Sequence, residues 1–382
     1  MMSRPFVFLC AVALAGCASV EPCGSSVPAE KDPVRVGVYV GPGARGSGVC
    51  HWVSLMALSP DVAPSYVDER TIAEGALDAL DVLVMPGGLA TVECKALKST
   101  GADEKLVSFI RRGGGYVGTC AGCNLILNEP RYLRLAPYDH PSAIGHGTGL
   151  LALKFNDRAE ALCGIRACTR LVRYSGGPVM RPGKPVAGAS FETVATYDCD
   201  LVAEYGTNTT VGAMRGGAAA ICGTYGRGRL FAFAAHPEYR SDTLDLIQGA
   251  FRYVTGRDVR FVRRQRASGD LCVAVYASGM GGIPDAEMVA ALATANGIDV
   301  VYANLKEELG VGLLDHADAL VLPAGYADAY GKKFNPRTAE FFERFARGGG
   351  KVFACGAALR RAPAGAIPCA SAKNLVERVL EL

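Results

Sequence analysis

Cys120 lies in the segment "RRGGGYVGTCAGCNLIL", residues 111–127, in which a short apolar run after three glycines turns sharply into a helical pattern. Gly118 and Gly122 flank the cysteine, and small residues there allow a strand-to-helix turn that projects the side chain at the edge of a sheet. The amino end of a helix also stabilises a thiolate. Cys120 is therefore a candidate nucleophile, and a buried inert thiol is the alternative.

A nucleophilic cysteine needs a base that takes its proton and a third group that orients the base. Among the five histidines, His236 directly follows Leu230–Ala235, an apolar run that predicts a buried strand. Glu238 comes two positions later and points to the same side, so imidazole and carboxylate can form the base and orienter of a triad. A purely structural histidine is the alternative, which the nearby Gly-rich elbow makes the weaker one.

The elements that must position these groups alternate between strands and helices. Val34–Val40 and Val82–Met85 are short apolar runs that end in Gly-rich loops, Tyr116–Gly118 leads into Cys120, and Lys105–Arg112 predicts a helix. Short buried strands joined by helices predict a parallel sheet with helices on both faces. In such a sheet the reactive groups gather at the carboxyl ends of the strands.

Two segments of the chain occur twice. "LDALDVLVMPGG" at residues 77–88 returns as "LDHADALVLPAG" at residues 314–325, and "RGGGYVGTCAG" at 112–122 returns as "RGGGKVFACGA" at 347–357. The shared order of the matches predicts an internal duplication, with a second, smaller and degenerate copy of the same fold.

The predicted second copy lacks the small residues of the first elbow. Phe353 stands in the place of Gly118, and Ala357 in the place of Gly122. We therefore expect Cys355 to be a packed core thiol without catalytic function.

The amino terminus is expected to direct export. Arg4 precedes an apolar run, Phe6–Ala15, that is too short to span a bilayer but is typical of a signal peptide. The run ends in "LAGC", which resembles the lipobox of bacterial lipoproteins and predicts acylation of Cys17. This pattern predicts a membrane-anchored lipoprotein of the bacterial cell envelope, with a plain secretory signal as the alternative.

Composition and cysteine spacing exclude several classes of function. The 40 basic and 37 acidic residues are scattered and give a net charge of +3, so we expect no nucleic-acid partner. Cys120 and Cys123 form a lone CxxC, and no cysteine or histidine cluster has the spacing of a zinc site, so we expect no metal and no cofactor. Outside the cytoplasm, structural disulfides could form among Cys50, Cys94, Cys163, Cys168, Cys199 and Cys222.

The elbow and the downstream His-x-Glu resemble the class I glutamine amidotransferase-like fold, whose signature joins Gly-x-Cys-x-Gly to His-x-Glu. More narrowly, "GGGYVGTCAG", "YSGGPV", "YGRGRLFAFAAHPE" and "VGVYVGPG" are similar to the biotin-protein ligase N-terminal domain family over Val34–Phe261. This resemblance implies an α/β fold with a flavodoxin-like, doubly wound parallel sheet. It also implies that Cys120 is the nucleophile, with His236 and Glu238 completing the triad.

The same resemblance implies an oxyanion hole formed by the backbone amides of Gly88 and Ala121. The segment "YSGGPV" is expected to contribute to the substrate pocket, although an ordinary Gly-Pro turn is an equally open alternative. The expected pocket residues are Gly87, Tyr174, Gly176 and Gly177.

Neither a ligase catalytic domain nor an ammonia-accepting synthase domain is visible in the sequence. "GRGRL" at residues 226–230 superficially resembles a biotin-ligase loop, but we interpret it as a turn before the His236 strand and assign it no biotin role. The predicted division is a signal peptide at 1–17, a tether at 18–33, an amidotransferase-like domain at 34–262, a linker at 263–269 and a degenerate amidotransferase-like domain at 270–382.

Attack of Cys120 on a carbonyl would produce a thioester that water or an amine resolves, so the sequence predicts an amidase or peptidase-like hydrolase. Its partner would be a small-molecule or peptide amide, and the membrane would be reached through the lipid anchor alone. A non-catalytic small-molecule-binding module and a structural envelope lipoprotein remain as alternatives.

Overall fold

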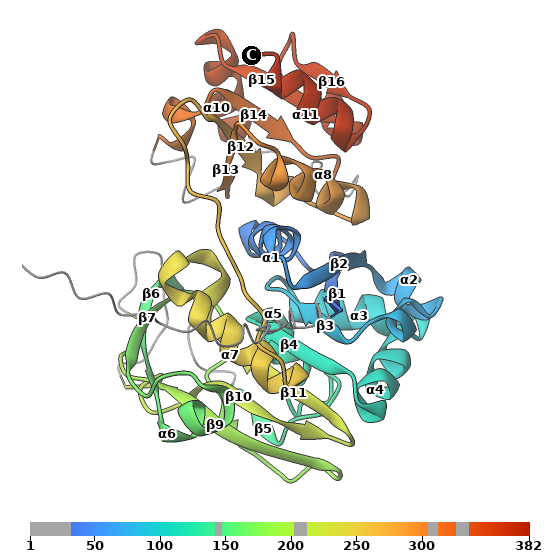
Figure 1. Cartoon of the computed structure of the whole chain (residues 1–382), viewed down its shortest axis with the longest axis vertical. Coiled ribbons are helices and arrows are strands. Elements are labelled where there is room, and N and C mark those ends of the chain that lie inside the picture. The colour runs from blue at the N-terminus through green and yellow to red at the C-terminus, as the bar shows by residue number, and fades with distance from the viewer. Residues whose placement is uncertain (1–31, 142–146, 202–211, 305–311, 326–335) are drawn as a thin grey trace, which may run out of the picture. The chain divides into compact units, whose positions relative to one another are not determined.

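The computed structural model describes residues 32–141, 147–201, 212–304, 312–325 and 336–382. The predicted signal peptide with Cys17, and the tether up to residue 31, lie outside these described residues. Pro33–Leu382 form one compact unit that contains two large sheets (Figure 1). No helix within the described ranges has the length and apolar character needed to cross a bilayer.

The first sheet has nine strands in the order β2-β1-β3-β4-β11-β10-β9-β6-β7. Its first five strands are parallel to one another, which confirms the predicted α/β class with flavodoxin-like strand order. These strands are β1 (Val34–Tyr39), β2 (Val62–Val67), β3 (Val82–Met85), β4 (Gly115–Thr119) and β11 (Gly228–Phe233).

Helix α4 (Ala102–Arg112) shows why the sequence folds locally as predicted. Leu106, Phe109 and Ile110 recur at helical spacing and are buried, acidic residues occupy the first turn and arginines the last. Gly113, with φ of 122°, ends the helix. The other helices of this region are α1 (Ser47–Leu58), α2 (Glu69–Ala73), α3 (Ala90–Thr100), α5 (Ala121–Leu125), α6 (Asp157–Cys163) and α7 (Leu244–Thr255), with short 3-10 turns at Ala76–Ala79, Pro237–Tyr239 and Ser241–Thr243.

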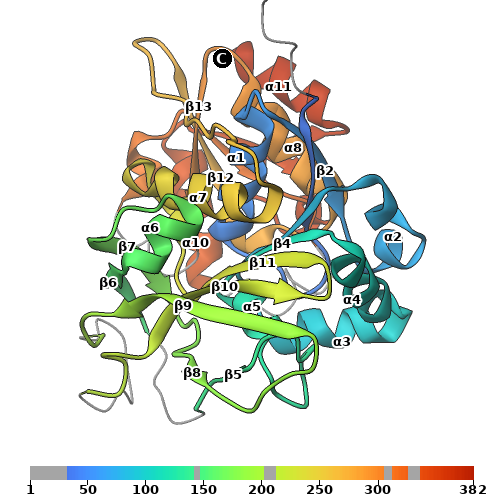
Figure 2. The same ribbon diagram turned by 60° about the horizontal axis from the view of Figure 1, so that its bottom comes forward.

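The remaining four strands of this sheet are antiparallel, so the expectation of a parallel sheet is wrong for this half (Figure 2). The change of direction occurs at the hairpin between β10 and β11, where Tyr225 pairs with Gly228 and Gly226 has φ of 60°. "GRGRL" lies in this hairpin, as interpreted from the sequence. The antiparallel strands are β6 (Thr148–Phe155), β7 (Thr169–Ser175), β9 (Ala189–Tyr197) and β10 (Ala218–Tyr225), and β5 (Tyr138–Asp139) pairs with β8 (Arg181–Pro182) in a separate small sheet.

The second sheet is fully parallel, with the order β13-β12-β14-β15-β16. Position by position this order matches β2-β1-β3-β4-β11 of the first sheet. Its strands are β12 (Leu271–Tyr276), β13 (Ile298–Ala303), β14 (Ala319–Leu322), β15 (Lys351–Cys355) and β16 (Ile367–Cys369), and its helices are α8 (Ile283–Thr294), α10 (Pro336–Arg347) and α11 (Ala372–Leu380), with 3-10 turns at Ala277–Gly279, Leu313–His316 and Gly356–Arg360.

The two copies of the repeated segment occupy the same place in their sheets. Asp81, just before β3, accepts a hydrogen bond from the Arg35 amide at 2.9 Å, and Asp318, just before β14, accepts one from the Cys272 amide at 2.7 Å. We refer to residues 33–262 as the first lobe and 270–382 as the second lobe. That duplication produced the second lobe, and that a domain boundary falls at 263–269, stay predictions.

The apolar core is continuous through the first sheet and reaches one face of the second. Along β12, Val273 and Val275 belong to this core, whereas Ala274 and Tyr276 belong to a separate cluster on the other face. Alternation of this kind follows from the two-residue period of a strand, and it shows that both faces of the second sheet are covered.

Candidate active site

Cys120 is the residue at which β4 becomes α5, and its backbone is strained. β4 ends at Thr119 and α5 begins at Ala121. Cys120 has φ of 51° and ψ of −101°, and among the described residues other than glycine only Arg134 shares a positive φ. The Cys120 amide donates to the Phe233 carbonyl of β11 at 2.9 Å, which fixes the elbow against the neighbouring strand.

The two glycines that flank Cys120 are required by close packing. A Cβ atom on Gly122 would lie 2.0 Å from the Met85 carbonyl oxygen, and one on Gly118 would lie 2.7 Å from the backbone of Gly122. The Tyr116 hydroxyl donates to the Gly122 carbonyl at 2.6 Å and holds the turn from below. The sharp elbow thus depends on the absence of side chains at both positions.

β11 delivers the histidine and the carboxylate to the same edge of the sheet. The chain leaves β11 at Phe233, and the His236 amide donates to the Arg173 carbonyl at 2.7 Å. A 3-10 turn, Pro237–Tyr239, then folds Glu238 back so that its Oε1 lies 2.7 Å from His236 Nδ1. His236 is buried and Glu238 is fully buried.

The imidazole of His236 joins the carboxylate to the Cys120 thiol. Since Nδ1 contacts Glu238, Nε2 is left for the hydrogen bond with Cys120. Burial lowers the pKa of His236, but the Glu238 carboxylate and the neighbouring Cys120 side chain raise it by more, so that the net result is a pKa of about 10. The structure brings the three predicted residues together, and their catalytic roles remain predictions.

The two amides expected to form the oxyanion hole have no protein acceptor within the described part of the chain. Ala121 is the first residue of α5, where amides have no partner inside the helix, and Gly88 lies in the loop after β3. Gly87 is packed so tightly that a Cβ atom would lie 2.5 Å from His236 Cε1 and 3.3 Å from Cys120 Cβ. Gly87 therefore lies in close contact with the side chains of both Cys120 and His236.

The segment "YSGGPV" reaches the thiol through its backbone. The Cys120 thiol lies 3.4 Å from the Ser175 carbonyl oxygen. Tyr174 is fully buried and its hydroxyl donates to the Gly177 carbonyl at 2.7 Å, while a Cβ atom on Gly177 would lie 1.8 Å from the Ala234 carbonyl oxygen. Tyr174 and Gly177 thus hold the segment against the end of β11, and Gly176, with φ of 70°, makes the turn between them. That these residues line a substrate pocket stays a prediction.

Two residues that support the triad were not singled out in the sequence. Arg263, at the start of the predicted linker, donates from its guanidinium to the Glu238 carbonyl and lies 3.3 Å from His51 Nδ1. Gly48, in the first turn of α1, leaves room for Glu238, because a Cβ atom there would lie 3.2 Å from Oε1. No spacing or motif marks either residue, since a basic residue in a polar stretch ordinarily faces solvent.

All cysteines within the described residues are free thiols, so the structure forms no disulfide among the six candidates. Cys163 and Cys222 nevertheless lie side by side, with their thiols in a hydrogen bond. Burial raises the pKa of Cys123 and of Cys50, which keeps these thiols protonated. Over the same described residues, no three His, Cys, Asp or Glu side chains gather as a metal site.

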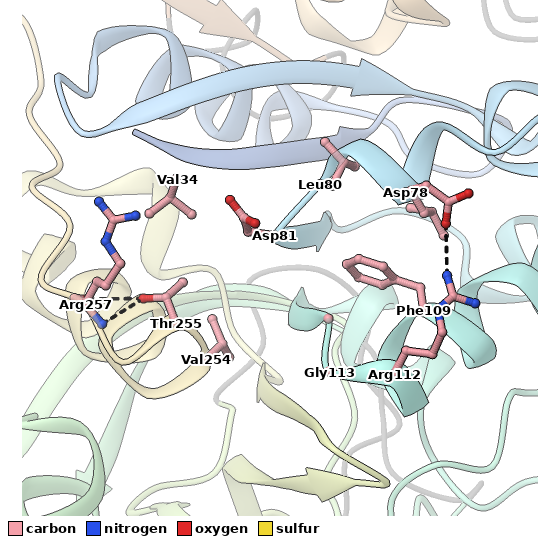
Figure 3. Close-up of a pocket in the computed structure, with 12 residues that line it drawn as sticks. Val34, Asp78, Leu80, Asp81, Phe109, Arg112, Gly113, Val254, Thr255 and Arg257 are labelled. Carbon is pink, nitrogen blue, oxygen red and sulfur yellow. Dashed lines mark hydrogen bonds and ion pairs between the residues drawn. The ribbon is translucent and has the colours of Figure 1, made fainter. Parts of the chain in front are cut away.

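A cavity of about 500 Å³ lies at the opposite edge of the first sheet (Figure 3). Val34 opens β1, Asp81 precedes β3 and Gly113 precedes β4, so this cavity faces the amino ends of the strands. Arg112 and Asp78 form a hydrogen-bonded ion pair of 2.9 Å on its wall. Cys120 and His236 lie at the carboxyl ends and take no part in it.

Comparisons with known proteins support the fold around Cys120. Residues 34–125 match the family model described as biotin-protein ligase, N terminal. The chain is 36% identical over 94 residues to a biotin–protein ligase from Schizosaccharomyces pombe, of which it covers 14%. The resemblance seen in the sequence is confirmed for this segment, and the strand order confirms the predicted α/β class with a flavodoxin-like sheet.

The chain also resembles other relatives and solved structures. The chain is 28% identical over 180 residues to the pyridoxal 5'-phosphate synthase subunit PdxT of Bifidobacterium adolescentis, covering 45% of this chain and 81% of that protein. It spans only 17% of a probable cobyric acid synthase from Methanococcus maripaludis, at 31% identity. Among solved structures, the chain resembles PurLQS from Thermotoga maritima at 16% identity and a TM-score of 0.42. The match covers 58% of this chain and 99% of that chain. A glutamine amidotransferase from the same organism matches at 14% identity and a TM-score of 0.37, and this match covers 58% of this chain and 84% of that chain.

Proposed function

We propose that this protein is a cysteine-dependent hydrolase of a carboxamide, acting through a thioester on Cys120. The amidotransferase-like fold and the PdxT relative support cysteine-dependent chemistry of the amidotransferase type. The finer proposal is an amidase or peptidase-like enzyme whose substrate is a small-molecule or peptide amide.

In the proposed reaction the Cys120 thiolate attacks the carbonyl carbon, forming the C–S bond while the C=O π pair moves to oxygen. The amides of Gly88 and Ala121 donate to this oxyanion. The C–N bond then breaks, and the imidazolium of His236 gives its proton to the leaving amine. Water attacks the thioester, His236 takes its proton, and Cys120 leaves as the thiolate, so one amide and one water yield an acid and an amine.

The backbone of Cys120 is the observation that carries this proposal. A residue other than glycine at φ of 51° and ψ of −101° is costly, on the order of 1–3 kcal/mol, and such strain gathers at functional sites. Here the strained residue is also the one whose thiol contacts His236, which in turn is held by Glu238. A purely structural elbow would need neither the strain nor the histidine.

Thiol reactivity tests the proposal directly. Folded, unreduced protein is titrated with limiting iodoacetamide near neutral pH, and mass spectrometry identifies the alkylated cysteines. We expect Cys120 to react before the other thiols, and His236→Ala to slow its labelling, because the variant loses the imidazolium that stabilises the thiolate. His316→Ala, which removes an exposed histidine of the second lobe, is the matched control and should leave the rate unchanged.

Two outcomes contradict the proposal. One is a Cys120 that is tied in a disulfide, with Cys123 or another thiol, in the unreduced protein. The other is a Cys120 that reacts equally fast in the wild type and in His236→Ala. Either result favours a binding module that keeps the fold without turnover.

We further propose that the protein is an exported lipoprotein anchored through Cys17 in the bacterial cell envelope. The support is the apolar run Phe6–Ala15 that ends in "LAGC". Cys17→Ala should release the protein from the membrane fraction or stop its maturation. An unchanged membrane fraction of this variant would refute the anchor while leaving the proposed chemistry untouched.

A further inference from the structure

The second lobe has a loop that corresponds to the loop after β3 in the first lobe, which carries the Gly88 amide of the predicted oxyanion hole. Residues 314–325 repeat residues 77–88, so Ala324 stands in the place of Gly87 and Gly325 in the place of Gly88. β14 before this loop also takes the position of β3 in the strand order. The two loops can therefore be compared amide by amide.

The amides of the second loop are occupied by a side chain of the same lobe. Asp285 Oδ1 accepts from the Ala324 amide at 2.9 Å, and Oδ2 accepts from the Gly325 amide at 2.9 Å and from the Gly281 amide at 2.8 Å. Asp285 is only 2% exposed. Three backbone amides thus converge on one buried carboxylate, as they would on an anion.

Helix α8, which carries Asp285, corresponds to α1 of the first lobe. Both helices have twelve residues and begin after a glycine of the same unusual conformation, Gly46 with φ of 81° and Gly282 with φ of 92°. Counted from these glycines, Asp285 takes the place of Val49. The first lobe therefore has an apolar side chain where the second lobe has a carboxylate, and the Gly88 amide has no protein acceptor among the described residues.

We propose that the second lobe retains an anion hole, and that Asp285 fills it as a built-in ligand. The hole has the chemistry to take a carboxylate or a polarised carbonyl oxygen, and its internal occupant excludes any such ligand from the neighbourhood of Cys355. This inference does not depend on the proposed function of the first lobe.

Removal of the carboxylate should open the hole to a small anion. In Asp285→Ala the Cβ atom remains, so the vacated space matches one carboxylate group, and formate supplies that group alone. We expect the thermal midpoint of the variant to fall, because three backbone amides lose their acceptor, and formate to restore more than half of the loss. Acetate, which carries an additional methyl group, should restore less, and chloride at equal ionic strength should restore none.

The matched control is Asp315→Ala, which removes an exposed carboxylate of the same lobe. Neither this variant nor the wild type should gain stability from formate beyond that given by chloride. The proposal is overturned if Asp285→Ala melts at the wild-type temperature, or if formate raises its midpoint no more than chloride does.

If Asp285→Ala does not fold, amide hydrogen exchange in the wild type tests whether Asp285 occupies the hole. The amides of Ala324 and Gly325 should be strongly protected, because they donate to a buried carboxylate, whereas the equivalent Gly88 amide should exchange quickly. Rapid exchange at Ala324 and Gly325 would show that Asp285 does not occupy the hole.

Discussion

The two lobes each carry a cysteine at the end of the same strand of the sheet, and the backbone passes through the two cysteines differently. Cys120 has φ of 51° and ψ of −101°, whereas Cys355 has φ of −107° and ψ of 141°, the ordinary conformation of a strand. The second sheet places its positive φ one residue later, at Gly356 with φ of 47°, where glycine adopts it without strain. The first lobe retains strain that the architecture does not require.

The neighbouring strand shows a matching difference. Thr119 pairs with Phe233, and Ala354 pairs with Pro368, so the third residue after each partner is His236 in the first lobe and Ser371 in the second. Ser371 caps α11, accepting from the Asn374 amide at 3.1 Å. Strain at the cysteine and a histidine after the neighbouring strand thus occur together in one lobe and are both missing from the other, as expected if the strain serves the thiol.

The largest effect should come from filling the space behind the first elbow. Gly122→Ala places a Cβ atom 2.0 Å from the Met85 carbonyl oxygen, and we expect it to lower the free energy of unfolding by about 3 kcal/mol. Ala357→Gly, the reverse change at the equivalent position, should cost about 1 kcal/mol or less, since it only adds backbone freedom. Urea denaturation of both variants measures the difference, and equal losses would show that the two elbows are packed alike.

The second-largest effect is expected in the pH dependence of stability, which should differ between the two lobes. The pKa of His236 is raised from 6.5 to about 10, so the folded state keeps a proton that the unfolded chain releases. The stabilisation is fully present below pH 6.5 and is lost as the pH rises toward 10. The stability of the wild type relative to His236→Gln should therefore fall across this window, which urea denaturation at a series of pH values measures.

Ser371→Ala is the counterpart of this test in the second lobe. Its difference from the wild type should not change with pH, because a serine hydroxyl does not titrate in this range. If the stabilities of the wild type and of His236→Gln change with pH in the same way, the imidazole is not charged in the folded protein.

A smaller effect of opposite sign is expected when the strain at the first cysteine is released. Cys120→Gly should stabilise the protein by about 1 kcal/mol, because glycine adopts a positive φ without steric cost. Cys355→Gly should instead destabilise it by about 1 kcal/mol, since that residue has ordinary strand geometry. Thermal melts of the two variants give the sign of each change, and a destabilised Cys120→Gly would mean that the thiol contacts outweigh the strain.

The sequence was sufficient for features that depend on local pattern. The strands β1, β3 and β4, the helix α4, the elbow and the approach of His236 to Cys120 all follow from apolar runs, glycines and strand ends. The antiparallel half of the first sheet was missed, because strand direction there depends on the hairpin at Gly226 and on pairing between distant segments. Arg263 and Asp285 were missed for a related reason, since a charged residue in sequence gives no sign that it will be buried against backbone groups.

The smallest effect is expected at Cys355. A hydrogen bond with Cys369 and burial raise the pKa of Cys355, and the lobe around it offers Ser371 and Lys373 in the places of His236 and Glu238. Cys355→Ala should therefore leave the rate at which iodoacetamide labels Cys120 unchanged, and with it any amide hydrolysis. If Cys355→Ala slows Cys120 labelling while the thermal midpoint is unchanged, the second lobe takes part in the chemistry. In that case the difference between the two elbows does not separate an active site from an inert one.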